Sequence, residues 1–220
     1  MSLVLFDLDN TLIAGDSDHL WGQFLVEQAF VDVTAYRRQN DEFYRDYQRG
    51  ELDIAAYLRF ALAPLRQFSL ERLAELHQRF LQEKIEPLRL PQAEALISKH
   101  KNSGDMLAII TSTNRFVSEP IARLLGIDHL LATELEITAG RYTGNIVGVP
   151  CYKSGKITHL RHWLETQQQD MRGSYFYSDS INDLPLLEKV DNPVAVDPDS
   201  GLEKHARREG WPILHLRGGD

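Results

Sequence analysis

The stretch that decides the fold is residues 3–13, which read Leu-Val-Leu-Phe-Asp-Leu-Asp-Asn-Thr-Leu-Ile. Four apolar residues lead directly to Asp7, Asp9 and Thr11, which occupy alternate positions. A short apolar run that ends in polar side chains is typical of a buried parallel strand whose carboxyl end opens into a site. Two neighbouring carboxylates repel each other, so they require a cation, a shared proton or both. The stretch therefore predicts a strand over residues 3–8 with a charged site at its carboxyl end.

The composition limits the class of protein and its partners. The chain has 220 residues and a formal net charge of −8, which argues against a nucleic acid or an anionic membrane surface as its partner. The single cysteine, Cys151, allows no disulfide within the chain and fits a reducing cytoplasm. We expect no signal peptide and no membrane-spanning segment, because Asp7 interrupts the first apolar run and no other run is long enough.

The order of the predicted elements changes after about residue 87. Apolar residues recur at helical spacing between Asp18 and Glu86, where Gly50 and Pro64 break the pattern and Asp53 is a candidate N-cap. Ser69 is a second candidate N-cap. From residue 91 onward, apolar strands and helices alternate, which indicates an α/β fold with a doubly wound parallel sheet. We therefore predict an α/β core of residues 1–15 plus 88–220 and a helical cap domain of residues 16–87.

Polar residues form four clusters at predicted strand ends or helix starts. The clusters are Asp7-x-Asp9-x-Thr11, Thr111-Ser112-Thr113-Asn114, Lys153 with Lys156, and Asp179-Ser-Ile-Asn-Asp183. The carboxyl ends of parallel strands lie at one edge of a sheet, so these clusters can converge. Carboxylates suit Mg²⁺, whereas a lysine and small hydroxyl groups suit a phosphoryl group. The combination predicts Mg²⁺-dependent phosphoryl transfer.

On these four motifs, the chain resembles the haloacid dehalogenase superfamily of phosphohydrolases over essentially its whole length. It is most similar to the phosphoserine-phosphatase-like branch, in which a helical cap follows the first strand. One motif alone is weak evidence, but four in order at strand ends are specific. The resemblance implies a phosphomonoesterase in which Asp7 attacks phosphorus and forms an aspartyl-phosphate. Asp9 is then the general acid and base, Thr111 holds a phosphate oxygen, and Lys156 neutralises Asp7 and the phosphoryl group.

The resemblance also implies the metal ligands and the phosphate contacts. Asp179 is expected to bind Mg²⁺ together with Asp7 and the carbonyl of Asp9, while Asp183 holds a metal-bound water or the lysine. Ser112 and Asn182 are expected to bind the substrate. Lys153 competes with Lys156 for the lysine role, and we favour Lys156 because the sequence after Gly155 fits a helix start with this lysine facing the sheet edge.

Residues of the predicted cap carry the information on the substrate. Asp16 matches an acidic residue that reads the substrate amine in phosphoserine phosphatases, and Asp18 adds a second carboxylate. Arg59 lies near the position of a carboxylate-reading arginine in those enzymes, although a solvated helix arginine is an equal alternative. Residues 7–18 and 178–188 also resemble bacterial histidinol-phosphate phosphatases of the superfamily. We expect an amine-bearing phosphate ester, with histidinol phosphate first and phosphoserine second.

Other classes of function make different demands on the sequence. A phosphotransferase or phosphomutase would use the same aspartyl-phosphate and pass the phosphoryl group to an alcohol. A P-type transport ATPase lacks the second aspartate and has membrane helices, so Asp9 and the composition argue against it. A non-catalytic binding module should have lost Asp7 or Asp179, and both are present. We predict a small phosphate ester as the partner, with no nucleic acid and no membrane, and make no prediction of oligomeric state.

Overall fold

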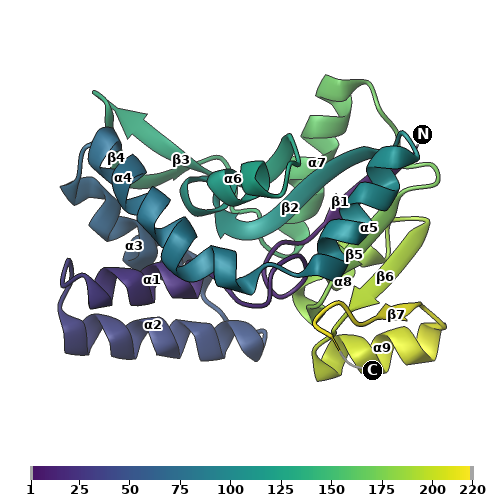
Figure 1. Cartoon of the computed structure of the whole chain (residues 1–220), viewed down its shortest axis with the longest axis horizontal. Coiled ribbons are helices and arrows are strands. Elements are labelled where there is room, and N and C mark those ends of the chain that lie inside the picture. The colour runs from purple at the N-terminus through teal and green to yellow at the C-terminus, as the bar shows by residue number, and fades with distance from the viewer. Residues whose placement is uncertain (1, 219–220) are drawn as a thin grey trace.

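A mostly parallel sheet lies at the centre of the protein (Figure 1). The structure is a computed structural model that describes residues 2–218, and seven strands are found within this range. The strands are β1 (Leu3–Phe6), β2 (Met106–Asn114), β3 (His129–Thr138), β4 (Arg141–Val147), β5 (Tyr175–Ser178), β6 (Asn192–Val196) and β7 (Ile213–Leu214). Their order is β4-β3-β2-β1-β5-β6-β7, and only the β3–β4 pair is antiparallel. The short apolar run near the N-terminus, β1, is thus the central strand of the sheet.

Both faces of the sheet are buried under helices, which explains why β1 is apolar at every position. Val4 and Phe6 belong to one hydrophobic cluster, whereas Leu3 and Leu5 belong to another, as expected for side chains that alternate along a strand. Helices α5 and α6 pack in the first cluster, and α7, α8 and α9 pack in the second. These helices are α5 (Pro91–Asn102), α6 (Arg115–Leu124), α7 (Ser154–Gln167), α8 (Leu184–Leu187) and α9 (Ser200–Glu209). The predicted doubly wound α/β fold is confirmed.

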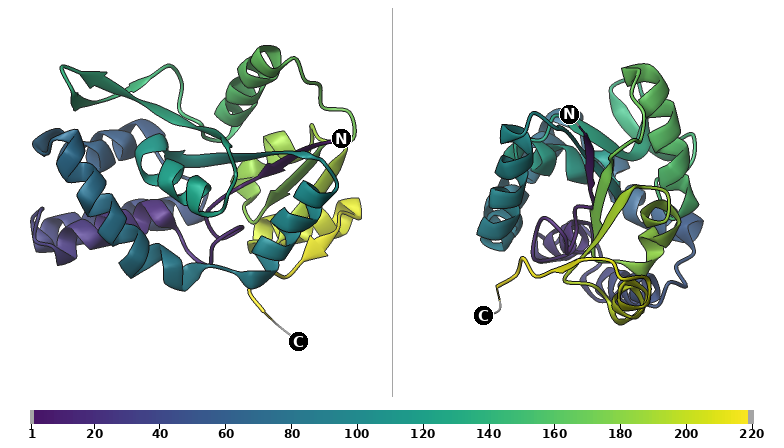
Figure 2. Two further views of the ribbon diagram at one scale, coloured as in Figure 1. Left: turned by 45° about the horizontal axis from the view of Figure 1, so that its top comes forward. Right: turned by 90° about the vertical axis from the view of Figure 1, so that its right-hand side faces the viewer.

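Four further helices separate β1 from α5 and lie together at one end of the sheet (Figures 1 and 2). They are α1 (Ser17–Glu27), α2 (Val33–Gln48), α3 (Ile54–Leu62) and α4 (Leu70–Phe80). The side chains of Asp53 and Ser69 cap α3 and α4 as predicted, and Asp16 and Asp32 cap α1 and α2 in the same way. The β3–β4 hairpin extends over α3 and the turn that follows it. The division into a core domain and a cap domain stays a prediction.

The two segments that join these helices to the sheet run side by side. The backbone N–H of Ala14 donates to the carbonyl of Leu88 at 2.9 Å, and Ile13 forms an antiparallel bridge with Arg89. The insertion therefore begins and ends beside the turn that carries Asp9. This placement puts the four helices over the carboxyl end of β1.

The first strand is shorter than the predicted range of residues 3–8. The backbone of Asp7 still donates to the carbonyl of Tyr177, but the carbonyl of Leu8 already accepts from Leu12, so a turn begins there.

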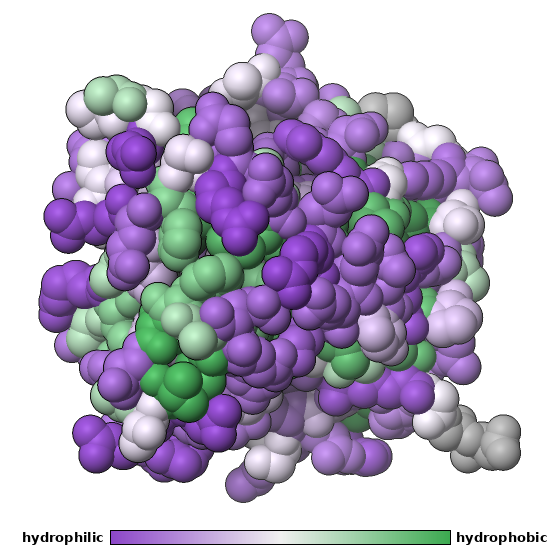
Figure 3. Space-filling model, turned by 60° about the vertical axis from the view of Figure 1, so that its left-hand side comes forward, coloured by the Kyte–Doolittle hydropathy of each residue, from purple (hydrophilic) through white to green (hydrophobic). Residues whose placement is uncertain are grey.

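None of the helices described in residues 2–218 is long and apolar enough to cross a membrane. The face that Figure 3 shows is mostly hydrophilic, with a limited hydrophobic patch.

Candidate active site

The turn after β1 places two carboxylates at the edge of the sheet. Asp7 and Asp9 are both buried, and Asn10 between them and Thr11 has a left-handed backbone, with a φ of 58°. Asparagine tolerates this conformation better than most residues other than glycine. The turn directs Asp7 toward α7 and Asp9 toward α1 and β2, because their hydrogen-bond partners lie there. The sequence pattern of alternate aspartates thus leads to two separate environments.

Lys156 is the lysine that contacts Asp7. It lies in the first turn of α7 with only 1% of its surface exposed, and its Nζ is 2.7 Å from Asp7 Oδ1 and 2.7 Å from Asp183. Burial lowers the pKa of Lys156, but the two carboxylates outweigh this effect and raise it above its ordinary value, so the amine stays charged. A Cβ atom at Gly155 would lie 2.0 Å from the carbonyl oxygen of Pro150. The glycine thus permits the close approach that brings the lysine to the site.

Lys153 does not reach the carboxylates. Its Nζ donates to the backbone carbonyl of Gly50 at 2.8 Å, at the end of α2. Its own backbone is left-handed, with a φ of 49°, directly before α7 begins. Of the two candidate lysines, only Lys156 is brought to Asp7.

The loop after β5 supplies the second pair of carboxylates. The backbone N–H of Asp179 donates to Thr11 Oγ1 at 3.0 Å, and Thr11 Oγ1 lies 3.2 Å from Asp179 Oδ1, so this loop is tied to the turn after β1. Ser178 Oγ donates to Asp183 Oδ2 at 2.7 Å, and the side chain of Ser180 caps the following turn. The two serines thus use their hydroxyl groups to hold the loop.

Asp9 accepts two short hydrogen bonds, one from the backbone N–H of Ser17 and one from Thr113 Oγ1, both at 2.6 Å. Burial and the nearby charge of Asp16 raise the pKa of Asp9 to about 7, against the lowering effect of these hydrogen bonds. The carboxyl is therefore held in one orientation and is poised between its two protonation states near neutral pH. Sequence analysis did not single out Thr113, although it lies in the predicted cluster after β2.

The predicted cap residues Asp16 and Asp18 face the same cavity as Asp7 and Asp9. Asp16 caps α1 by accepting from the backbone of His19 at 2.8 Å. Asp18 accepts from Asn114 Nδ2 at 3.2 Å and from the hydroxyl of Tyr57. Burial raises the pKa of both carboxyls to about 7.

All but one of the remaining residues that were predicted to bind the phosphate or the substrate lie at or beside the cavity. Thr111 and Ser112 line the cavity, and Asn182 is buried beside it, donating to the carbonyl of Tyr47 at 3.1 Å. Arg59 is exposed on α3 and is not among the residues that line the cavity. The arrangement thus favours the solvated alternative for this arginine.

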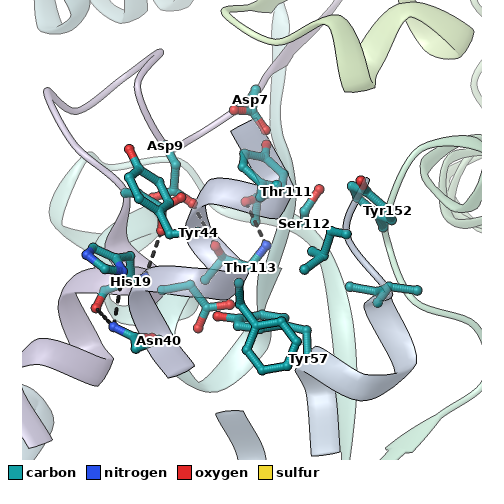
Figure 4. A pocket seen from close by; sticks show the side chains of 16 residues that line it. Asp7, Asp9, His19, Asn40, Tyr44, Tyr57, Thr111, Ser112, Thr113 and Tyr152 are labelled. Atoms are coloured by element: carbon teal, nitrogen blue, oxygen red, sulfur yellow. Dashed lines mark hydrogen bonds between the residues drawn. The ribbon is translucent and has the colours of Figure 1, made fainter. Parts of the chain in front are cut away.

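Aromatic side chains form much of the cavity wall. Figure 4 shows Asp7, Asp9 and Thr111 at one end of the cavity and His19, Asn40 and Tyr57 at the other. Tyr44 stacks on the ring of His19, with 4.5 Å between the ring centroids. The aromatic residues that line the cavity are Phe43, Tyr44, Tyr47, Tyr57 and Tyr152. Their spacing along α2 and α3 fits a buried helix face equally well, so the sequence held no signal to separate the two roles.

The carboxylates of the site are suited to a divalent cation. Burial raises the pKa of Asp7 and Asp179, and the nearby charge of Asp183 raises both further. Lys156 contacts Asp7 and Asp183, whereas no contact between Lys156 and Asp179 is found in the described residues. In residues 2–218, no group of three or more His, Cys, Asp or Glu side chains is arranged to hold a metal. The ligand set that the sequence implied has two side chains and the carbonyl of Asp9. An acidic set of oxygen atoms that lacks its counter-charge fits Mg²⁺.

In this site, an aspartate after the central strand contacts a buried lysine, and a second acidic loop lies beside them at the edge of a doubly wound sheet. This arrangement is typical of a class of hydrolases that transfer phosphoryl groups. The chain belongs to the haloacid dehalogenase-like hydrolase family, whose family model matches residues 4–188. Within that family the chain is a phosphatase.

The relatives cover the full length of the chain. A histidinol-phosphatase of Neisseria meningitidis serogroup C (strain 8013) is 49% identical over 220 residues, which cover 98% of this chain and 99% of that protein. A solved structure of a protein of unknown function from Bordetella pertussis Tohama I is 41% identical, with a TM-score of 0.92 and 98% of each chain covered. A substrate-bound phosphoserine phosphatase is 18% identical, with a TM-score of 0.71 and coverage of 100% of this chain and 94% of the other, so it shares the fold.

Proposed function

We propose that the protein hydrolyses a small phosphate ester whose leaving group carries positive charge and no carboxylate, with histidinol phosphate as the first candidate. The observation that carries this proposal is the charge of the cavity wall. Asp7, Asp9, Asp16 and Asp18 line it, whereas the described lining residues include no lysine and no arginine. The 49% identity to a histidinol-phosphatase supports the same choice.

The cavity wall discriminates between the two candidate substrates. Histidinol phosphate carries an amine and an imidazole, which Asp16 and Asp18 can pair with beyond the reacting end. Phosphoserine adds a carboxylate, which would lie among like charges without a basic partner, because Arg59 is exposed on α3. A like-charge contact in a desolvated site disfavours binding strongly.

The catalytic steps use Asp7 and Asp9 in different roles. Asp7 attacks phosphorus and forms an aspartyl-phosphate, while its contact with Lys156 offsets the build-up of negative charge. Asp9, held by Ser17 and Thr113, gives its proton to the leaving oxygen. The same carboxylate then takes a proton from the water that hydrolyses the aspartyl-phosphate. Thr111 and Asn182 would hold the phosphoryl oxygens, and Asp183 would keep Lys156 in position through their contact at 2.7 Å.

Mg²⁺ is the cofactor that we propose for this site. Asp7, Asp179 and the carbonyl of Asp9 would hold it, and it would supply charge neutralisation to the phosphoryl group. The structural link between Thr11 and Asp179 supports this choice, because it fixes the two loops that carry the ligands relative to each other.

The experiment that tests the proposed function is a kcat/KM comparison across phosphate esters in the presence of Mg²⁺. The panel contains histidinol phosphate, phosphoserine, phosphoethanolamine and several sugar phosphates. We expect histidinol phosphate to be the fastest and phosphoserine to be slower than phosphoethanolamine, since the added carboxylate is repelled. Faster turnover of sugar phosphates than of amine-bearing esters would overturn the proposal. Release of inorganic phosphate without an added alcohol separates hydrolysis from phosphotransferase or phosphomutase activity.

A further inference from the structure

The end of helix α2 is fastened to the loops that carry the catalytic lysine and its partner. The carbonyl of Tyr47 accepts from Asn182 Nδ2 at 3.1 Å, and the carbonyl of Gly50 accepts from Lys153 Nζ at 2.8 Å. The hydroxyl of Tyr152 lies 3.5 Å from Asn182 Oδ1, and its ring centroid is 6.2 Å from that of Tyr47. These contacts fix the backbone of Tyr47 relative to the loops around Asp7.

The side chain of Tyr47 lines the cavity together with Asp7 and Thr111. Burial and the charges of Asp7 and Asp179 raise the pKa of Tyr47 well above its ordinary value, so its hydroxyl keeps the proton and can donate it. Among residues 2–218, no hydrogen bond from this hydroxyl to another protein group is found. Nearby tyrosines differ, because Tyr57 bonds to Asp18 and Tyr44 bonds to Asn10.

We propose that Tyr47 is a catalytic residue whose hydroxyl donates a hydrogen bond to a phosphoryl oxygen of the bound ester and its transition state. A phosphoryl oxygen in this cavity would give the half-buried Tyr47 hydroxyl a charge-assisted hydrogen bond. Negative charge spreads over three phosphoryl oxygens during transfer, and donors fixed around them lower the barrier. Thr111 approaches from the sheet and Tyr47 from the inserted helices, so the two donors hold the group from opposite elements. The inference rests on the proposed function only in placing a phosphate ester against Asp7.

The test compares Tyr47→Phe with Tyr142→Phe, which removes the same atom from a tyrosine on β4 outside the cavity. Two esters are used, p-nitrophenyl phosphate and histidinol phosphate, together with inhibition by orthovanadate. We expect Tyr47→Phe to lower kcat/KM about 10- to 100-fold on both esters and to weaken vanadate inhibition by a similar factor, as for loss of a hydrogen bond to a charged group. Tyr142→Phe should stay within twofold of the wild type.

The outcomes separate the role of Tyr47 from the identity of the substrate. A loss on p-nitrophenyl phosphate with weaker vanadate inhibition supports the role of Tyr47 even if histidinol phosphate proves a poor substrate. Unchanged kcat/KM and unchanged vanadate inhibition would overturn it. A loss confined to histidinol phosphate would also overturn it, because the hydroxyl would then act on the leaving group. Equal urea midpoints of Tyr47→Phe and wild type exclude a folding defect as the cause of a loss.

Discussion

Replacing Lys156 with methionine should damage both stability and activity, because it removes the cation from between two buried carboxylates. Lys156 is 1% exposed, the Asp7 and Asp183 side chains are 5% and 3% exposed, and both contacts are 2.7 Å. Removing one partner of a buried ion pair costs about 3–5 kcal/mol, since the remaining charges stay desolvated. Loss of the charge beside Asp7, the nucleophile that we propose, should also lower kcat/KM by about 10²- to 10³-fold.

Urea unfolding of Lys156→Met at pH 8 and at pH 5.5 measures this cost. Without the lysine, burial and mutual repulsion keep the pKa of Asp7 above its unfolded value of 3.8. The folded state then takes up protons as pH falls, so the destabilisation should be larger at pH 8 than at pH 5.5. Lys84→Met is the matched control, because Lys84 pairs with Glu27 at 2.8 Å on the surface, and its loss should cost about 0–1 kcal/mol.

A second substitution makes the same test more specific. Asp183→Asn added to Lys156→Met removes one of the two stranded charges, so the double variant should be more stable than Lys156→Met alone. Equal urea midpoints for wild type and Lys156→Met, or no rescue by Asp183→Asn, would refute the reasoning about the buried charges.

Three further predictions concern the nucleophile, a buried histidine and a helix contact. Asp7→Asn should lower kcat by at least roughly 10³-fold. The variant should also lack the ³²P label that the wild-type enzyme retains when its reaction with a ³²P-labelled ester is stopped with acid. Full activity of the variant would contradict the nucleophile assignment. Burial lowers the pKa of His77 from 6.5 to about 4 while its Nε2 hydrogen-bonds to the Val117 carbonyl at 2.9 Å. The buried neutral form of His77 contributes fully to the free energy of unfolding above pH 6.5. This contribution falls by roughly 3 kcal/mol in all as the pH drops toward 4 and the folded state resists protonation. The free energy of unfolding of His77→Gln, measured with urea, should lack this part of the pH dependence. Gly22→Ala should destabilise the protein, since a Cβ there would lie 2.6 Å from the Asn40 amide; overpacking costs about 1–3 kcal/mol, against about 1 kcal/mol of helix propensity gained, and an unchanged melting temperature would contradict the contact.

Much of the site was predictable because polar residues at the ends of parallel strands must meet at one edge of the sheet. Asp7, Lys156 and Asp183 follow from this rule, and the choice of Lys156 over Lys153 followed from the start of a helix. The cavity wall was not predictable in the same way. Tyr47 lies at a helical spacing that serves a packed core as well as a cavity, and only the three-dimensional position of α2 distinguishes them. For the same reason, the sequence did not show whether Arg59 faces the cavity or the solvent, and in the structure its side chain is exposed to solvent.

The central position of β1 has a consequence for synthesis of the chain on the ribosome. The ribosome makes Asp7 149 positions before its partner Lys156, and it makes Thr11 168 positions before Asp179. Until β5 has emerged, one edge of the apolar strand β1 has no neighbour to pair with. The nascent protein therefore carries Asp7 without its charge partners, and an exposed strand edge in that interval is a point where a chaperone or a second nascent chain can bind.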